Sequence, residues 1–256
     1  MLSHLFSNKF GKLKVLKLLG KGGQASVFLS KDEQGRKFAA KIYDCRLNSD
    51  ISIILKKKCL KHKNIIKVLD KNVSYLDKQG VLLPYYPMGD LHGFFKRTHS
   101  LNWENTFSYD IFTAIGECHE NEIAHRDIKP ANFLIASKED TYSAILCDFG
   151  LATNAYKIKR SGGTFSFAAP EVLKRETYNY KCDIWSAGMT VLYMNAGERF
   201  ILNLTNKKIP FDFDFLLKNH ERIVKNFSED TKFILNASLQ KNPEERLEAK
   251  EILKIF

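Results

Sequence analysis

Residues 125–132 read HRDIKPAN, and a second short stretch, residues 148–150, reads DFG. The first stretch combines a carboxylate at Asp127, an ammonium group at Lys129 and a carboxamide at Asn132. Asp127 can accept or orient the proton of a hydroxyl group, and Lys129 can neutralise negative charge on a phosphate in transfer. These residue types are therefore suited to act together on a hydroxyl and a phosphate.

Oxygen ligands for a metal occur in both stretches. Asn132 offers a carboxamide oxygen, and Asp148 opens the second stretch with a carboxylate. Mg²⁺ prefers hard oxygen ligands of this kind, and it accompanies ATP in phosphoryl transfer. Asn132 and Asp148 are therefore chemically suited to bind Mg²⁺.

The two stretches, in this order, resemble motifs of the eukaryotic protein kinase family. The resemblance implies phosphoryl transfer from ATP to a hydroxyl, with Asn132 and Asp148 as metal ligands and with ATP and Mg²⁺ as cofactors. An apolar segment typical of a strand, Ala144–Cys147, lies between them, and Ala169–Pro170–Glu171 follows. The resemblance implies a single α+β protein kinase domain over residues 1–256, with ATP bound between two lobes. The implied parts are an N-lobe with a small antiparallel sheet and one helix (about 10–83), a hinge (about 84–89) and a mainly helical C-lobe (about 90–256).

The composition bears on the compartment of the protein and on the partners that its charge could attract. There is no run of about eighteen apolar residues, so no membrane span is expected, and the N-terminus lacks the apolar core of a signal peptide. The five cysteines are scattered, which favours free thiols in an intracellular compartment, cytoplasmic or nuclear. The net charge of +11 can attract nucleic acid, an acidic membrane or acidic substrates, or it can belong to a solvated lysine-rich surface.

The first part of the chain predicts a nucleotide-binding sheet. Apolar segments at Val15–Leu19, Ser26–Ser30 and Lys37–Tyr43 predict antiparallel strands, and the turn GKGGQA lets backbone N–H groups approach phosphates. Ala25 stands where the family has a third glycine. The resemblance assigns ATP contacts to Leu19, Gly20, Gly22, Val27, Ala39, Lys41, Leu83, Pro84, Tyr86, Asp90 and Leu134, with Lys41 also counted among the catalytic residues.

The next segment departs from the family pattern. Kinases pair the lysine that corresponds to Lys41 with a helix glutamate, but that position is Ile53 here. No acidic residue occurs between Asp50 and Asp70, and Asp50 lies too soon after Lys41 to reach it from mid-helix. Lysines at 56–58, 61 and 63 indicate either a solvated helix face or a docking patch for an acidic partner.

The later motifs extend the resemblance to the end of the chain. Apolar spacing predicts helices at Trp103–Asn121 and Asp183–Met194, a strand is expected at Val81–Tyr86 and another at Phe133–Ala136, and residues 242–246 resemble a final helical motif. In the activation segment, Asp148 to Glu171, the resemblance places Thr164 against the catalytic aspartate and lysine and makes Ser161 the nearest hydroxyl for a regulatory phosphate. It assigns structural roles to His125, Asp183 and Arg246, with Arg246 forming a buried pair with Glu171.

Three functions are compatible with these patterns. The first is a serine/threonine protein kinase with Asp127 as catalytic base, acting on protein substrates that are acidic or already phosphorylated. The second is a pseudokinase that serves as a nucleotide- or partner-binding scaffold, since the helix glutamate is absent. The third, a nucleic-acid binder, has only the positive charge behind it, so neither nucleic acid nor a membrane is an expected partner.

Overall fold

The computed structural model describes residues 4–23, 25–44, 62–98, 103–154, 157–159, 162–206 and 212–256. The chain forms two compact units, and each is described by itself. The first unit contains residues 1–61 and 65–87, and the second contains residues 62–64 and 88–256. The predictions at Ile53, Asp50 and Ser161 lie outside the described residues.

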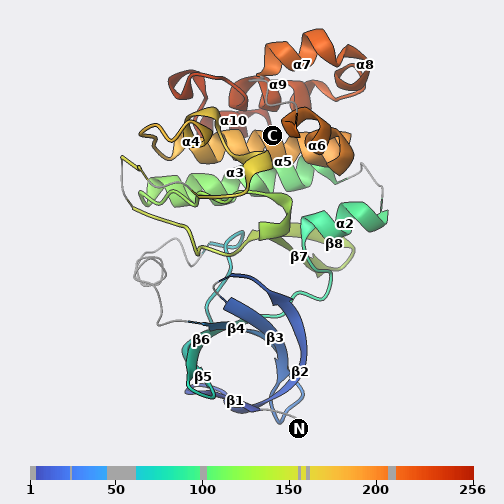
Figure 1. Ribbon diagram of the computed structural model, residues 1–256. Coiled ribbons are helices and arrows are strands. Elements are labelled where there is room, and N and C mark those ends of the chain that lie inside the picture. Colours follow the sequence, from blue (N-terminus) through green and yellow to red (C-terminus); the bar gives the residue numbers. More distant parts are fainter. Residues whose placement is uncertain are drawn as a thin grey trace. The chain divides into compact units, whose positions relative to one another are not determined.

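Antiparallel strands build the first unit. Its described strands are β1 (His4–Ser7), β2 (Gly11–Lys21), β3 (Ala25–Lys31), β4 (Lys37–Tyr43), β5 (Asp70–Tyr75) and β6 (Lys78–Pro84). They close into a barrel in the order β1-β2-β3-β4-β6-β5 (Figure 1). Side chains alternate along β4, so Phe38, Ala40 and Ile42 share one face. That face joins a buried apolar cluster with Leu5, Leu13, Val73 and Leu82.

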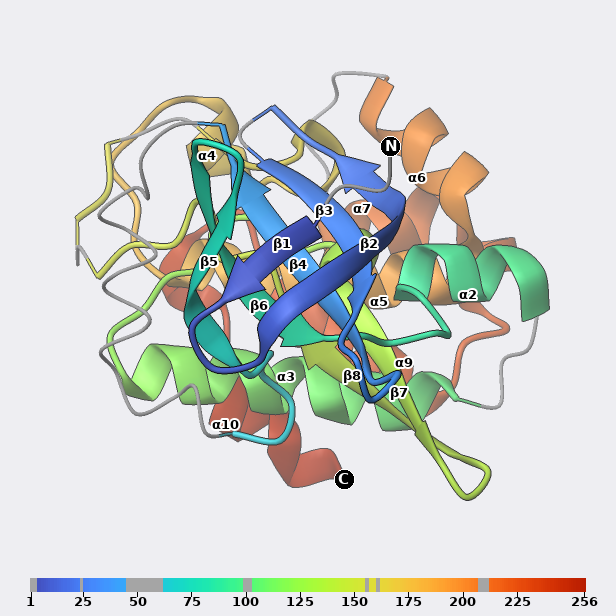
Figure 2. The same ribbon diagram turned by 90° about the horizontal axis from the view of Figure 1, so that it is seen from below.

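Strand β1 closes the barrel because it pairs with both β2 and β5 (Figure 2). The carboxylate of Asp70 anchors the turn after β1: it accepts hydrogen bonds from Ser7 Oγ at 2.5 Å and from the Lys9 backbone N–H at 2.9 Å. Pairing on both sides satisfies backbone groups that an open sheet edge would expose. The sequence patterns place the first strand at Val15, so β1 is an addition that they do not predict.

Helices dominate the second unit. They are α2 (Leu91–Thr98), α3 (Glu104–Glu120), α4 (Pro170–Leu173), α5 (Lys181–Ala196), α6 (Glu198–Asn206), α7 (Phe213–Asn219), α8 (Glu221–Val224), α9 (Glu229–Ser238) and α10 (Ala249–Ile252). Every residue from Cys182 to Met194 in α5 is buried, and α3 and α9 both pack against this helix (Figure 1). A hairpin of β7 (Phe133–Lys138) and β8 (Thr141–Leu146) lies against α3. None of the described helices combines the length and the apolar character that a membrane crossing requires.

The α+β class predicted from the sequence is confirmed, whereas several element ends differ. The strand predicted at Val81–Tyr86 is β6, which ends at Pro84, where the pairing with β4 also ends at Phe38. Proline has no N–H with which to extend the ladder. Residues 242–246, which resemble a final helical motif, contain one turn of 3-10 helix at Pro243–Glu245, and Arg246 after it is extended.

Candidate active site

The loop between α3 and β7 carries most of the predicted catalytic side chains, and a buried carboxylate in α5 holds it. Asp183 Oδ2 accepts a hydrogen bond from the His125 N–H at 2.7 Å, and Oδ1 accepts one from the Arg126 N–H at 2.8 Å. Arg126 has a φ of 71°, a left-handed conformation that residues with side chains adopt only when their surroundings hold them there. Asp183 therefore fixes the backbone one residue before Asp127.

Asp183 keeps its charge although it is 1% exposed. Burial acts to raise the pKa of its carboxyl, but the hydrogen bond from His119, the nearby histidines and the Arg126 N–H together hold the pKa below its ordinary value. A carboxylate that accepts several N–H bonds is stabilised in its ionised form. His119 comes from the last turn of α3, with Nε2 3.3 Å from Asp183 Oδ2, and no motif in the sequence singles it out.

Four side chains meet in this loop region, Asp127 and its three partners Thr164, Lys129 and Asn132. Thr164 Oγ1 donates to Asp127 Oδ1 at 2.8 Å, and Lys129 Nζ lies 2.8 Å from Asp127 Oδ2. The Lys129 ammonium also donates to Thr164 Oγ1 at 2.7 Å. The Asn132 amide donates to the Asp127 backbone carbonyl at 2.7 Å and to Oδ2 at 3.0 Å. Both oxygens of Asp127 are thus oriented by donors.

Thr164 links this group to the activation segment, since it is the only one of the four that lies outside residues 127–132. We expect Thr164→Val to lower kcat about tenfold with little change in the KM for ATP, because the variant keeps the side-chain volume but removes the hydroxyl that bridges Asp127 and Lys129. Steady-state kinetics with a protein acceptor measure both constants. Thr164→Ser keeps the bridge and is the matched control, so an equal loss in both variants would contradict the bridging role.

The DFG stretch lies directly beside the catalytic loop. Nε2 of His125 lies 3.0 Å from the Cys147 carbonyl oxygen, and the His125 and Phe149 rings contact edge to face at 4.8 Å between centroids. The Cys147 N–H donates to the Asn132 carbonyl at 2.8 Å. These contacts hold both sides of Asp148, which is itself left-handed with a φ of 59°.

The donor set fits a magnesium ion that is shared with phosphates. Because the Asn132 amide nitrogen donates to Asp127, its Oδ1 is the side-chain atom left to act as a ligand, and Asp148 offers a carboxylate. Among the residues that the structure describes, no group of three or more His, Cys, Asp or Glu side chains could hold a metal alone. Mg²⁺ commonly takes one or two protein ligands and completes its shell with waters and substrate phosphates.

Within the first unit, strand register brings the predicted nucleotide residues onto one sheet face. Val27 pairs with Lys41, and Ala39 pairs with Leu83. Lys41 and Ala39 are two apart on β4, so they point to the same side, opposite to the buried barrel cluster. Gly20 pairs with Val27 at the start of β3, next to Leu19. Gly22 lies in the turn that follows, where its N–H donates to the Ala25 carbonyl at 2.9 Å.

The remaining predicted nucleotide residues lie on both sides of the division between the units. Pro84 ends β6, and Tyr86 follows it, partly buried, in the first unit. In the second unit Asp90 and Leu134 form an isolated bridge. Asp90 Oδ1 accepts the Gly93 N–H at 2.7 Å and so caps the start of α2, which leaves its second oxygen for any other contact.

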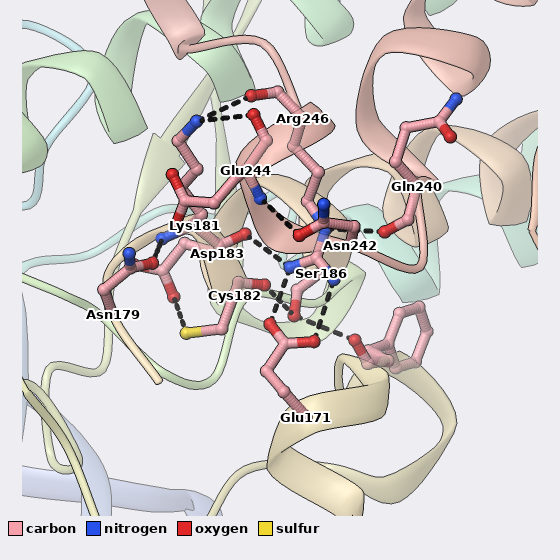
Figure 3. Close-up of polar contacts among 11 residues, drawn as sticks. Glu171, Asn179, Lys181, Cys182, Asp183, Ser186, Gln240, Asn242, Glu244 and Arg246 are labelled. Carbon is pink, nitrogen blue, oxygen red and sulfur yellow. Dashed lines mark hydrogen bonds and ion pairs between the residues drawn. The ribbon is translucent and has the colours of Figure 1, made fainter. Parts of the chain in front are cut away.

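A buried ion pair anchors the end of the activation segment. Arg246 donates from Nη1 and Nη2 to the two oxygens of Glu171, at 2.6 and 2.8 Å (Figure 3). The same guanidinium donates to the carbonyls of Gln240 and Lys181, at 2.9 and 3.1 Å. The Arg246 side chain is fully buried, so its positive charge is stabilised by these hydrogen bonds and not by water.

Comparisons with known proteins agree with this site. A family model described as the protein kinase domain matches residues 13–255. The chain is 28% identical over 264 residues to CBL-interacting serine/threonine-protein kinase 18 of Arabidopsis thaliana, which covers 95% of this chain and 49% of that protein. It is 28% identical over 262 residues to Aurora kinase B of Xenopus tropicalis, which covers 92% of this chain and 67% of that protein.

A third relative, calcium-dependent protein kinase 6 of Plasmodium berghei (strain Anka), is 30% identical over 231 residues, which are 81% of this chain and 15% of that protein. The chain spans about half the length of the CBL-interacting kinases that it matches, 49% and 57% for two of them. The family match extends over nearly the whole chain, from the barrel to the final turn. The chain therefore belongs to the protein kinase domain family.

Proposed function

We propose that the chain is an active serine/threonine protein kinase that transfers the γ-phosphoryl group of ATP to hydroxyl groups of protein substrates. The observation that carries the proposal is the oriented group at Asp127, in which Thr164 and Lys129 contact the two carboxylate oxygens. A network this complete supports catalysis, because positioning and electrostatics supply most of the acceleration in phosphoryl transfer.

Each site residue has a separate role in the proposed phosphoryl transfer. Asp127 orients the acceptor hydroxyl and takes its proton, while Lys129 neutralises charge on the phosphate in transfer. Asn132 through Oδ1 and Asp148 through its carboxylate would hold Mg²⁺. When bound, the ion neutralises charge on the phosphates of ATP. Lys41, Gly20 and Gly22 would contact the phosphates, and Asp90 would reach the ribose. Apolar side chains would surround the adenine: Leu19, Val27, Ala39, Leu83 and Leu134. Pro84 and Tyr86 would offer backbone groups to the adenine.

The runner-up is a pseudokinase that binds nucleotide or a partner without transfer. Its support is Ile53 in place of the helix glutamate, and the partner of Lys41 stays a prediction because Ile53 lies outside the described residues. A radiolabelled-ATP assay with a panel of generic protein acceptors separates the two functions. Transfer by the unmodified chain that is lost in Asp127→Asn supports the kinase, whereas ATP binding without transfer under all conditions supports the scaffold.

Substrate preference is the finer part of the proposal, and we expect acidic flanks to be favoured. Lys157 and Lys159 of the activation segment are exposed, and Ala131 offers no charge in the catalytic loop. Burial first, and then the charges of Glu198 and Asp90, raise the pKa of Tyr193 to about 12, so its hydroxyl is neutral. The positive charges of Lys157 and Lys159 would therefore favour substrate peptides with acidic residues near the acceptor.

A positional peptide library measures this preference. A serine or threonine flanked by Asp, Glu or phosphoserine should be phosphorylated several-fold faster than one flanked by arginine, and added salt should reduce the difference because exposed charges are screened. The double variant Lys157→Ala, Lys159→Ala should lose the preference. Faster turnover of arginine-flanked peptides, or a preference for acidic ones that high salt leaves intact, would contradict the electrostatic account.

A further inference from the structure

The guanidinium of Arg126 contacts the start of the activation segment and a residue that follows the end of this segment. Nε donates to the Tyr178 hydroxyl at 2.9 Å, and Nη1 donates to the Leu151 carbonyl at 2.9 Å. The guanidinium carbon also lies 5.9 Å from the centre of the Tyr178 ring. One side chain of the catalytic loop thus connects the residue just after the DFG stretch with a residue shortly before α5.

Tyr178 reaches the middle of the segment through its backbone. The Ile158 N–H donates to the Tyr178 carbonyl at 2.8 Å, and the Tyr178 N–H donates back to the Ile158 carbonyl at 3.0 Å. Ile158 is buried at 2% exposure, although Lys157 and Lys159 on either side of it are exposed. Tyr178 therefore holds Ile158 with its main chain and Arg126 with its hydroxyl.

The stretch that leads to Thr164 packs closely on Arg126. A Cβ added at Gly163 would lie 2.6 Å from the Arg126 carbonyl oxygen, and Gly163 has a φ of 91°. A Cβ added at Gly162 would lie 3.2 Å from Arg126 Nη2. Only glycine fits at position 163, where the added Cβ would meet backbone and φ is positive, so the backbone of Arg126 limits the path of the chain into Thr164.

We propose that Tyr178 is a positioning residue that holds Arg126 and the activation segment in the arrangement where Thr164 meets Asp127, without a phosphoryl group on Ser161. The inference rests on the proposed kinase activity and adds how that activity is kept on. A segment of this kind can be ordered by a phosphate bound to arginine. Here an uncharged phenol accepts from the same guanidinium.

The surroundings of Tyr178 suit this role. The residue is buried at 6% exposure, so its hydrogen bond is sheltered from water. Burial raises the pKa of the phenol, against the lowering effect of the Arg126 hydrogen bond and charge, so the hydroxyl stays neutral around physiological pH. A neutral phenol can therefore accept this hydrogen bond without a phosphoryl group on the segment.

Tyr178→Phe tests the proposal, since it removes the hydroxyl but keeps the ring and both backbone bonds to Ile158. We expect kcat to fall about tenfold while the KM for ATP changes less than twofold, because a hydrogen bond to a charged group is lost away from the nucleotide. Tyr142→Phe is the matched control. The Tyr142 ring packs against Trp103 and Phe94, far along the chain from the segment, and this variant should keep the kcat of the unmodified chain.

A second readout does not depend on activity. Limited digestion with trypsin, followed by mass spectrometry, measures the cleavage rate after Lys157 and Lys159. We expect these rates to rise about tenfold in Tyr178→Phe and to stay unchanged in Tyr142→Phe, because cleavage follows local opening of the segment. If the unmodified chain shows no transferase activity, the proposed function fails, and the cleavage rates still test whether Tyr178 holds the activation segment.

Phosphatase treatment gives the third comparison. The unmodified chain, shown by mass spectrometry to carry no phosphate on Ser161, should retain its kcat. The proposal is overturned if phosphatase removes phosphate from Ser161 together with the activity. It is also overturned if Tyr178→Phe matches the unmodified chain in both kcat and cleavage after Lys157 and Lys159.

Discussion

Asp127→Asn should lower kcat about a thousandfold and leave the affinity for ATP within about twofold. In the structure Asp127 accepts hydrogen bonds from Thr164 at Oδ1 and from Lys129 and Asn132 at Oδ2. An asparagine replaces one accepting oxygen by an NH₂ group, which would face these donors, and it can no longer take a proton from the acceptor hydroxyl. The loss therefore falls on the chemical step. Steady-state transfer assays and equilibrium titration with a fluorescent ATP analogue measure the two effects separately.

Asp148→Asn is the matched comparison, because the same substitution occurs at a proposed metal ligand. It should weaken Mg²⁺-dependent nucleotide binding as well as transfer, since a carboxylate that would meet the ion loses its charge. Titrating each variant with ATP at several Mg²⁺ concentrations distinguishes the two aspartates. Equal effects of both substitutions on nucleotide affinity would contradict the separate roles of Asp127 and Asp148.

Arg246→Met should destabilise the second unit by about 3–5 kcal/mol, because it leaves the buried carboxylate of Glu171 without its partner. The Glu171 residue is 5% exposed and the Arg246 residue 1% exposed, so water cannot replace the lost bonds. For a chain of this size the change corresponds to a drop in Tm of about 10 °C. Thermal unfolding followed by circular dichroism measures it.

Two further variants test whether the loss of stability in Arg246→Met comes from leaving the buried charge of Glu171 unpaired. Lys232→Ala removes an ion pair with Glu229, whose side chain is 88% exposed, and we expect a change in stability below about 1 kcal/mol. The double variant Arg246→Met, Glu171→Leu removes both buried charges and should be more stable than Arg246→Met alone. A double variant that is no more stable than Arg246→Met would mean that the bonds of Arg246 to the backbone carbonyls, and not the charge pair, dominate.

The local chemistry of the site could be predicted from the sequence because its residues are close together in the chain. Asp127, Lys129 and Asn132 fall within one short loop, so their closeness follows from the sequence, although Asp183 of α5 holds the loop backbone. The period of two along any strand likewise places Ala39 and Lys41 of β4 on one face, and the almost wholly apolar run of α5 predicts a helix buried on every side. Such patterns can be recognised in a single sequence because the side chains repeat with the period of the strand or the helix.

Contacts between residues far apart in the chain depended on the tertiary structure. The resemblance to kinases suggested the Glu171–Arg246 pair, but nothing in the spacing of the two residues predicts it. Strand β1 was not predicted at all, because four residues carry too short a pattern, and only pairing with β2 and β5 makes them a strand.

Tyr178 is the clearest case of a residue whose role only the fold reveals. By itself it is an aromatic residue in a polar loop, with no motif around it. The sequence determined which groups could carry out phosphoryl transfer, since that depends on residue type and close spacing. The tertiary structure decided what holds them in place, because the Tyr178 hydroxyl, the Arg126 guanidinium and the Ile158 backbone meet only once the chain has folded.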